Sequence, residues 1–301
     1  MAREHIRAFA DVSNVKIEGI HSRTPSRAEA LAREFRIQSV CNSIQELYEK
    51  TRAKLVVVAV PELAVNSVSQ SCFEFPWAVM LEKPPGYNFQ DAEEIQSRAK
   101  AKKRRVIVGL NRRFLSSTQA AAKDLASDKT PRFIRVQDQQ SLETAVSLGY
   151  PPEVVQNWMY ANSIHTIDYL RLFGRGKITS VSPVFRWNRK KPSVVAAKIE
   201  FETGDIGIYE GIWNGPGPWA VTVTTEKKRW EMRPLEKAQF QMKGERTLHP
   251  VDVHPWDEKF KPGFRLQAEH AVRSALDEPS DSPTLDEAME TMRLIREIFK
   301  P

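Results

Sequence analysis

Three uninterrupted apolar runs constrain the fold of this 301-residue chain more than any other feature. They read LVVVAV from Leu55, WAVML from Trp77 and VIVGL from Val106. Strands without polar alternation suit a parallel sheet that is covered by helices on both faces. Helix-like stretches separate the runs, so residues 1–110 alternate between the two kinds of element. The sequence therefore predicts an α/β fold whose first domain, residues 1–115, contains a doubly wound parallel sheet.

The start of the chain departs from the usual plan of such a sheet. A dinucleotide-binding βαβ unit opens with a buried strand and a glycine-rich turn that precedes its first helix. Here residues 1–10 already read as a helix, a strand follows from Val15, and the first glycine is Gly19. We therefore expect the first strand and its GxGxxG turn to be missing, which makes the first domain N-terminally incomplete. Three explanations stay open: a start site placed inside a longer reading frame, which we prefer, a truncated gene, and a degenerate protein that kept the fold for binding.

The chain changes character after Asn111. Alternation in VVAAKIEFE, with the TGD turn at Thr203, indicates antiparallel hairpins with one buried face. The expected strands span residues 178–187, 193–202, 205–213, 219–225 and 229–233. SIHTIDYLRLFG reads as a helix that ends at Gly174, and LDEAMETMRLIREIF closes the chain as an amphipathic helix. We expect residues 116–301 to form an α+β domain with a largely antiparallel sheet.

Composition bears on the metal content, the cellular location and the partners of the protein. The two cysteines, Cys41 and Cys72, form no pattern typical of disulfide frameworks or metal sites, so we expect no metal and a cytoplasmic location. No segment approaches the ~20 apolar residues that span a bilayer, so we expect a soluble protein without a membrane partner. The 45 basic and 38 acidic residues give a net charge of +7, but the basic clusters fall at helix ends and turns. Nucleic acid is therefore the weaker interpretation, and a small-molecule substrate is the stronger one.

The segment LEKPPGYN carries the clearest chemical signal. It follows an apolar run, so we expect Lys83 at the C-terminal end of a strand, where open α/β sheets form their ligand crevice. A lysine there can hydrogen-bond a substrate hydroxyl, and a nearby cationic nicotinamide would make its proton easier to lose. The alternative is a solvated lysine before a proline turn. Position alone does not separate the two interpretations, but the run Glu82, Lys83, Pro84, Pro85 is distinctive.

With this segment, the chain resembles the Gfo/Idh/MocA family of NAD(P)-dependent oxidoreductases over nearly its whole length. The motifs that carry the resemblance are REHIRAF, HSRTPSRAEALAREF, VVVAVP, EKPPG, VGLNRRF, IHTIDYL and LDEAMETMRLI. The resemblance implies a Rossmann-like first domain, a second domain for substrate binding and oligomerisation, and a homo-oligomer. It implies hydride transfer between NADP(H) or NAD(H) and a secondary alcohol or ketone of a sugar, a sugar nucleotide or a cyclic polyol. The rival interpretation is a truncated or degenerate, non-catalytic ligand-binding or regulatory member of the family.

The resemblance also implies catalytic residues. Lys83 would act on the substrate hydroxyl, and the Lys83–Pro84 bond would be cis. His165 would be the general base that faces the nicotinamide, because a neutral imidazole suits proton removal near neutral pH. Asp168, one turn later, either orients the ring of His165 or makes a structural contact.

One position departs from the family pattern. Many members carry an aspartate four residues before the histidine, but this sequence has Ala161 there, and Asn162 is the nearest polar substitute. The full Lys/Asp/His set is therefore in doubt, whereas a pair of Lys83 and His165 remains, with Asn162 as a further catalytic candidate.

The turn HSRT bears on the choice of cofactor. It offers no acidic residue for a ribose 2′-hydroxyl, whereas Ser22 and Arg23 can bind a 2′-phosphate, so NADP is preferred over NAD. The alternative is that Arg23 only lies along a helix surface. By the resemblance, the other cofactor-binding residues are Pro61, Glu82, Asn111 and Arg112. Arg112 or Arg113 could instead meet an anionic substrate.

Overall fold

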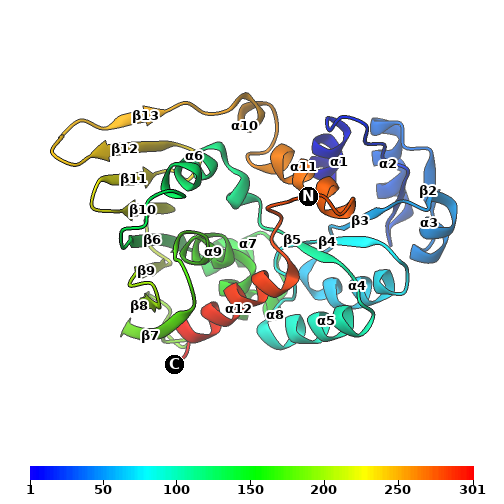
Figure 1. The fold of residues 1–301 in the computed structure, drawn as a ribbon. Helices are drawn as coiled ribbons and strands as arrows, with labels where there is room; N and C mark the ends of the chain where they lie inside the picture. The colour runs from blue at the N-terminus through cyan, green and yellow to red at the C-terminus, as the bar shows by residue number, and fades with distance from the viewer.

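The structure, a computed structural model, describes residues 1–301 and divides into two parts that lie side by side (Figure 1). The first part contains three parallel strands in the order β3-β4-β5. They are β3 (Leu55–Val58), β4 (Ala78–Glu82) and β5 (Val106–Gly109). The helices that connect them are α4 (Val65–Phe73) and α5 (Phe89–Ala101). The strands coincide with the three apolar runs, and β4 and β5 are almost wholly buried, as a covered parallel sheet requires.

The residues before β3 form a smaller layer. Its strands, β1 (Gly19–His21) and β2 (Ser39–Cys41), pair in parallel as a sheet of their own, and no hydrogen-bonded ladder joins them to β3. The strand expected from Val15 is therefore confined to β1. The helices of this layer are α1 (Ala2–Ala10), α2 (Pro25–Phe35) and α3 (Ile44–Thr51).

Local sequence signals set the starts of these helices. Thr24 is extended at the N-cap of α2 and Pro25 occupies the first helical position, although the Thr24 side chain makes no cap hydrogen bond. At the start of α3, Ser43 Oγ accepts a hydrogen bond from Glu46 N–H at 3.0 Å. The Glu46 carboxylate accepts from Asn42 N–H at 2.7 Å instead of from the N-cap residue, so only half of a capping box forms.

The second part is built on an eight-stranded sheet in the order β13-β12-β11-β10-β6-β9-β8-β7. Only β6 and β9 pair in parallel, so the predicted α/β class with a largely antiparallel second sheet is confirmed. The strands are β6 (Phe133–Gln140), β7 (Ile178–Phe185), β8 (Val194–Phe201), β9 (Ile206–Trp213), β10 (Ala220–Thr224), β11 (Lys228–Met232), β12 (Ala238–Met242) and β13 (His249–Val251). The sequence analysis missed β6, β12 and β13. In β6 the buried face carries Asp138 and Gln140, which hides the alternation of apolar and polar residues.

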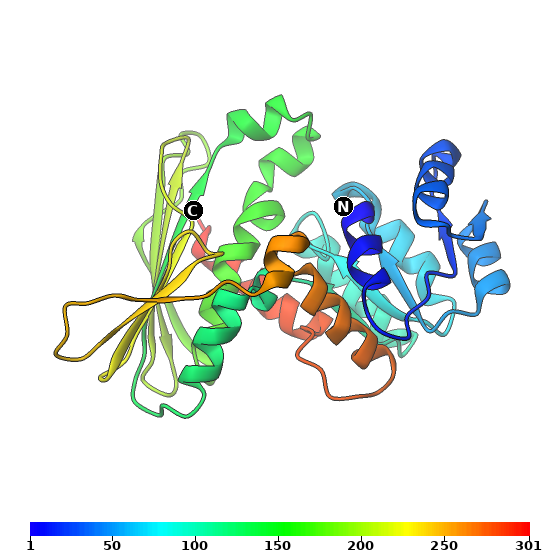
Figure 2. The ribbon, with the colours of Figure 1, turned by 90° about the horizontal axis from the view of Figure 1, so that it is seen from above.

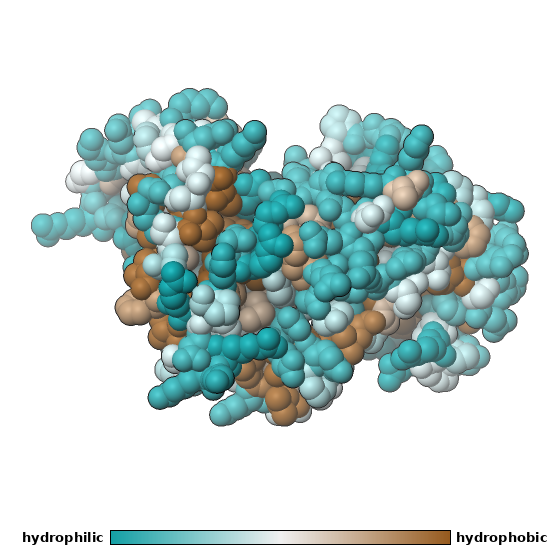
Figure 3. Space-filling model, turned by 90° about the horizontal axis from the view of Figure 1, so that it is seen from below, coloured by the Kyte–Doolittle hydropathy of each residue, from teal (hydrophilic) through white to brown (hydrophobic).

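Helices cover one face of this sheet and leave the other face bare (Figure 2). The covering helices are α6 (Ser116–Leu125), α9 (Ile164–Phe173) and α12 (Leu285–Ile298). The remaining helices are α7 (Leu142–Ser147), α8 (Pro152–Gln156), α10 (Pro255–Lys259) and α11 (Phe264–Ala275). Apolar side chains gather on the part of the molecule that holds this sheet (Figure 3), and the exposed ones include Val184, Phe185 and Val194.

Gly174 follows α9 as predicted, although it does not adopt the left-handed conformation that is common for a glycine after a helix. Its φ is −77°, a value that any residue adopts. A Cβ at this position would lie 2.2 Å from the ring of Phe201, so glycine is required because the end of α9 packs directly on β8.

The chain crosses between the two parts more than once. Helix α11 packs on α1 of the first part, and a β-bridge joins Ile107 of β5 to Thr284, just before α12. We keep a division near residue 115 as our proposal for the two domains, with α11 lying against the first. None of the helices combines the length and the apolar character needed to span a bilayer. No group of three or more His, Cys, Asp or Glu side chains is arranged to hold a metal ion.

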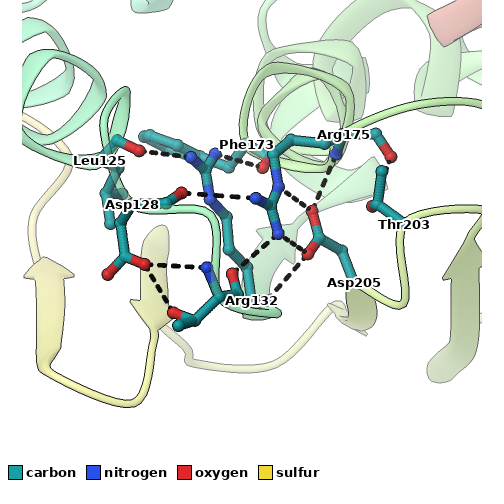
Figure 4. A network of polar contacts seen from close by, with 8 residues as sticks. Leu125, Asp128, Arg132, Phe173, Arg175, Thr203 and Asp205 are labelled. Carbon is teal, nitrogen blue, oxygen red and sulfur yellow. Dashed lines mark hydrogen bonds and ion pairs between the residues drawn. The ribbon is translucent and has the colours of Figure 1, made fainter.

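A buried polar network ties the start of β6 to the end of α9 (Figure 4). Asp205 accepts hydrogen bonds from Arg175 Nε at 2.9 Å, from Arg175 Nη2 at 2.6 Å and from Arg132 N–H at 2.9 Å. Arg132 donates in turn to the carbonyl oxygens of Phe173 and Leu125. Burial by itself would raise the pKa of Asp205, but the hydrogen bonds from Arg175 and Arg132 hold it below its ordinary value. The carboxylate therefore stays charged in the folded protein.

Removing this carboxylate's charge leaves a largely buried guanidinium group without its ionic partner. We expect Asp205→Asn to lower the free energy of unfolding by about 3–5 kcal/mol, measured by urea denaturation at pH 7. Because the pKa of Asp205 is lower in the folded than in the unfolded state, its contribution is present above the unfolded pKa and is lost as pH falls through the folded value. Glu226→Gln, in the exposed turn between β10 and β11, is the matched control. An Asp205→Asn protein as stable as this control would contradict the role of the network.

Candidate active site

The carboxyl ends of β3, β4 and β5 meet at one edge of the first sheet. Each strand leads into a residue that the sequence analysis singled out: Pro61 soon after β3, Lys83 directly after β4, and Asn111 soon after β5. Two short helical turns begin at this edge, η1 (Glu62–Ala64) and η2 (Asn111–Phe114). Because the strands are parallel, these residues share the crevice where open α/β sheets bind ligands.

Lys83 reaches from this edge to the second part of the chain. Its Nζ donates a hydrogen bond to the carbonyl oxygen of Ala161 at 2.9 Å. Burial lowers the pKa of Lys83; the charges of Glu82 and Glu62 oppose this shift, and those of Lys261 and Arg112 add to it. The Lys83–Pro84 peptide bond is cis, as the family resemblance implied. Lys83 is therefore a partly desolvated amine at the junction of the two parts, and not a solvated lysine before a turn.

Glu82, the neighbour of Lys83, has both carboxylate oxygens occupied. Oε1 is hydrogen-bonded to Nε2 of His5 in α1 at 2.6 Å, and Oε2 accepts from Lys83 N–H at 3.1 Å. Burial would raise the pKa of Glu82, but the hydrogen bond and charge of His5 lower it overall. Glu82 thus anchors the end of β4 to α1. The sequence analysis missed His5, because nothing in REHIRAF indicates a partner so distant in the chain.

Ala161 and His165 lie one turn apart. Ala161 belongs to a π-helical turn, η3 (Met159–Ser163), and His165 is at the start of α9. Burial lowers the pKa of His165 well below its ordinary value, and the charges of Lys83, Arg112 and Lys261 lower it further. The ring nitrogen Nδ1 is buried and has no hydrogen-bond partner. His165 is thus a neutral imidazole close to Lys83, able to accept a proton.

Asn162 is held by a chain of buried polar side chains. Its Nδ2 donates to Gln140 Oε1 at 2.8 Å, and Gln140 Nε2 donates to Asp138 Oδ1 at 2.6 Å. Tyr209 Oη donates to the other oxygen of Asp138 at 2.7 Å. Burial raises the pKa of Asp138 despite these hydrogen bonds. This chain fixes the amide nitrogen of Asn162 and leaves its Oδ1 without a recorded partner. The sequence analysis missed Gln140 and Asp138 because it did not predict β6.

Asp168 makes a structural contact, which decides between its two interpretations. It accepts from Arg113 Nε at 2.6 Å and from Arg113 Nη2 at 2.8 Å. Thr291 Oγ1 of α12 donates to the same carboxylate at 2.8 Å. Asp168 does not bond to the ring of His165, and Arg113 is committed to this buried ion pair.

Arg112 does not join this pair and lies beside a tryptophan instead. Its Nη1 is ion-paired with Glu236, and its guanidinium carbon lies 5.8 Å from the centre of the Trp219 ring. The same indole lies 6.1 Å from the ring centre of His165. Trp219 is positioned by a hydrogen bond from its Nε1 to the carbonyl oxygen of Gln139 at 2.8 Å. Arg112 and His165 are therefore neighbours of the same aromatic ring.

Asn111 connects the site to the loop between α10 and α11. Its Nδ2 donates to the carbonyl oxygen of Pro262 at 3.0 Å. A Cβ on Gly263 would lie 2.2 Å from the carbonyl oxygen of Asn111, so only glycine allows this approach, and its φ of +81° also favours glycine. The loop carries Lys261, whose charge acts on both Lys83 and His165.

Ser22 and Arg23 lie apart from these residues. They follow β1, and Ser22 Oγ accepts a hydrogen bond from Thr24 N–H at 3.2 Å. Arg23 is exposed and forms no ion pair. The structure thus brings together Lys83, Glu82, Asn111, Arg112, Asn162 and His165, and keeps Ser22 and Arg23 on a separate turn.

Comparisons with known proteins bear on both parts of the chain. Residues 1–110 match the model of GFO_IDH_MocA, described as an oxidoreductase family with an NAD-binding Rossmann fold. No curated protein sequence matches the chain.

Solved structures resemble the chain over its whole length. A dehydrogenase from Chromobacterium violaceum is similar over 99% of this chain and 90% of its own, with a TM-score of 0.84 and 17% identity. The aldose-aldose oxidoreductase from Caulobacter crescentus covers 99% of this chain and 92% of its own, with a TM-score of 0.79 and 16% identity. A levoglucosan dehydrogenase in complex with NADH is similar over 99% of this chain and 93% of its own, with a TM-score of 0.81 and 16% identity.

At these identities the solved structures establish the fold, while the match over residues 1–110 carries the relationship in sequence. The resemblance seen in EKPPG lies within this match and is confirmed there, whereas NRRF and IHTIDYL lie beyond it. Over residues 1–110 the chain is thus similar to the Gfo/Idh/MocA oxidoreductase family with its NAD-binding Rossmann fold.

Proposed function

We propose that this protein is an NADP(H)-preferring oxidoreductase that moves a hydride between the cofactor and a secondary alcohol or ketone of a sugar, a sugar nucleotide or a cyclic polyol. The observation that most supports the proposal is the contact of Lys83, from the first part, with the turn that carries Ala161 and His165 in the second. The names of two similar structures, aldose-aldose oxidoreductase and levoglucosan dehydrogenase, agree with a sugar-like substrate.

The residues present fit the two ends of a nicotinamide cofactor. At one end, His165 has a buried Nδ1 without a partner, and Lys83 has N–H donors beyond the one used by Ala161. At the other end, Ser22 and Arg23 supply donors suited to a 2′-phosphate. None of residues 1–18 is a glycine, so these residues do not supply the glycine-rich turn for the pyrophosphate. When bound, the nicotinamide supplies or accepts the hydride.

The chain's own residues supply hydrogen bonding and proton transfer. Lys83 Nζ hydrogen-bonds the substrate oxygen, and its lowered pKa makes proton exchange with that oxygen easier. His165, which is neutral in the folded protein, accepts the hydroxyl proton during oxidation and returns it during reduction. Asn162, held by Gln140 through its amide nitrogen, offers Oδ1 to a further substrate hydroxyl. Glu82 contributes by holding the backbone of Lys83.

Ala161 supports a second candidate. A backbone carbonyl receives Lys83 where many family members have an aspartate, so the proton chemistry falls on Lys83 and His165 alone. A member that binds a ligand without turning it over would have the same feature. Turnover separates the two candidates.

We also propose a homo-oligomer that pairs through the bare face of the C-terminal sheet. Val184, Phe185 and Val194 are exposed large apolar residues on β7 and β8. Burying such residues against a second copy removes apolar area from water.

Cofactor selectivity tests the role of the turn after β1. In calorimetric titrations we expect NADPH to bind more tightly than NADH. Arg23→Ser should weaken NADPH binding by roughly tenfold and leave NADH unchanged, because the guanidinium pairs with the 2′-phosphate alone. Arg27→Ser, at another exposed position nearby in α2, is the control. Equal affinity for the two cofactors would overturn the NADP preference, and binding of neither by a folded chain would overturn the oxidoreductase proposal.

Catalysis tests the pair of Lys83 and His165. With a sugar, sugar-nucleotide or polyol that the protein turns over, we expect Lys83→Met to lower kcat by about 10²–10⁴-fold. The dissociation constant for NADPH should change little, because Lys83 contacts the reacting oxygen and not the body of the cofactor. Lys300→Met, near the C-terminus, is the control. Tight NADPH binding without turnover of any substrate in the panel would favour the non-catalytic candidate.

The charge state of His165 can be measured directly. We expect the NMR titration of its ring, assigned by comparison with His165→Gln, to show a pKa well below 6.5. Because this pKa is lower in the folded than in the unfolded state, folding stability should fall as pH drops below about 6.5, and less so in His165→Gln. A midpoint at or above 6.5 would show that the imidazole is not desolvated and would remove the basis for its role as the neutral acceptor.

A further inference from the structure

We propose that the substrate carries an anionic group, a carboxylate or a phosphate, which Arg112 binds beside Lys83 and His165. This inference rests on the proposed oxidoreductase function, because it names the substrate class of the same crevice.

Two other arginines in this protein show how a buried guanidinium group pairs with a carboxylate. Arg113 donates through Nε and Nη2 to both oxygens of Asp168, at 2.6 and 2.8 Å. Arg175 donates through the same two atoms to both oxygens of Asp205, at 2.9 and 2.6 Å (Figure 4). In each case the edge formed by Nε and Nη2 matches the two oxygens of a carboxylate, which is the strongest geometry for such a pair.

The guanidinium group of Arg112 finds its hydrogen-bond partner through a different nitrogen. Its Nη1 pairs with Glu236, while its buried Nε has no hydrogen-bond partner. The Nε–Nη2 edge of the guanidinium group therefore has no acceptor. The Arg112 side chain is nevertheless held in place by Glu236 and by the Trp219 ring beneath it. A buried donor without a partner is costly, so an acceptor for this edge stabilises the site. The side chain remains 22% exposed, so it is accessible from solvent.

The position of Arg112 links this edge to the reaction. Arg112 and His165 both lie beside the Trp219 ring, and an indole face packs well against the apolar face of a sugar ring. A ligand on Trp219 can thus present a carbinol carbon to His165 and Lys83 and an anionic group to Arg112.

The three cations near the crevice, Lys83, Lys261 and Arg112, are matched by three carboxylates. Lys83 donates to a backbone carbonyl, and Lys261 forms no ion pair. Glu82 and Glu236 are bonded to His5 and Arg112, while Glu62 acts on Lys83 through its charge. Net charge therefore does not select the ligand, and the open edge of Arg112 carries the preference for an anion.

Another arginine with an unpartnered buried Nε does not compete for this role. Arg171 lines a small cavity of about 210 Å³ with Arg113, Leu172 and Glu287. Glu287 already supplies a negative charge there, and neither Lys83 nor His165 lines that cavity.

The test observes the Arg112 Nε–H group itself. Malonate, phosphate and, as a neutral probe, glycerol are titrated separately into the ¹⁵N-labelled full chain, and the arginine Nε–H signals are followed by NMR. The signal of Arg112 is assigned by its loss in Arg112→Lys. We expect malonate or phosphate to shift it saturably, glycerol to leave it unmoved, and the signals of Arg113 and Arg175 to stay in place because their edges are filled.

Substitution gives a second readout. Followed through the Trp219 indole N–H, Arg112→Lys should weaken malonate binding by roughly tenfold, because an ammonium keeps the charge but not the two-donor edge. Arg293→Lys, on the exposed side of α12, is the control and should bind as the parent chain does. The proposal is overturned if the Arg112 signal moves no more than those of Arg113 and Arg175, or if glycerol moves it equally.

A final experiment decides whether Arg112 binds an anionic group of the substrate or a phosphate of the cofactor. The malonate titration is repeated with the chain saturated by NADPH, and the shift of Arg112 should persist. If NADPH alone produces the shift and blocks the effect of malonate, Arg112 binds the cofactor and the substrate assignment is wrong. If NADPH does not bind at all, the oxidoreductase proposal fails, whereas the malonate titration still decides whether Arg112 binds anions.

Discussion

The buried ion pair between Arg113 and Asp168 holds the two parts of this protein together where the site forms. Arg113 directly follows the sheet of the first part, Asp168 lies in the middle of α9, and Thr291 of α12 donates to the same carboxylate. Burial opposes the charged form of Arg113, but the charge of Asp168 raises its pKa overall. Such a pair offsets its desolvation cost only when its geometry is good, and here both guanidinium donors of one edge are used. The register of α9 against the end of β5 follows from this pair.

With α9 held in this way, the chemistry of the crevice follows from desolvation and charge. Ala161 lies over Lys83, so an amine that would otherwise be solvated loses water and its pKa falls. His165 is surrounded by burial and by cations, which keeps its imidazole neutral. Buried carboxylates contribute by position: Glu82 holds the backbone of Lys83 and Asp138 holds Gln140, which in turn holds Asn162. A network of buried hydrogen bonds thus surrounds Lys83, His165 and Asn162, which keep unused hydrogen-bond donors or acceptors.

Features that depend on near neighbours in the chain were predicted from the sequence. The apolar runs became β3, β4 and β5, and Lys83 lies at the end of its strand. Features that depend on distant partners were not. β6 was missed because Asp138 and Gln140 occupy its buried face, where they are satisfied by Tyr209, Trp158 and Asn162. Gly174 ends its helix as predicted, but the reason for a glycine there is the ring of Phe201, a distant residue that packs against it.

The sequence by itself determined the class of fold and the placement of Lys83 at a strand's carboxyl end, because hydrophobic periodicity and short motifs act over a few residues. It left open whether Asp168 serves His165 or the scaffold, and which of Arg112 and Arg113 has donors to spare. Tertiary structure decided both, since the answer depends on which acceptor lies within hydrogen-bonding distance. Arg113 finds Asp168 and is consumed by it, whereas Arg112 finds Glu236 on one edge only. Adjacent residues of the same type thus differ in the donors they leave free, because the fold gives them different partners.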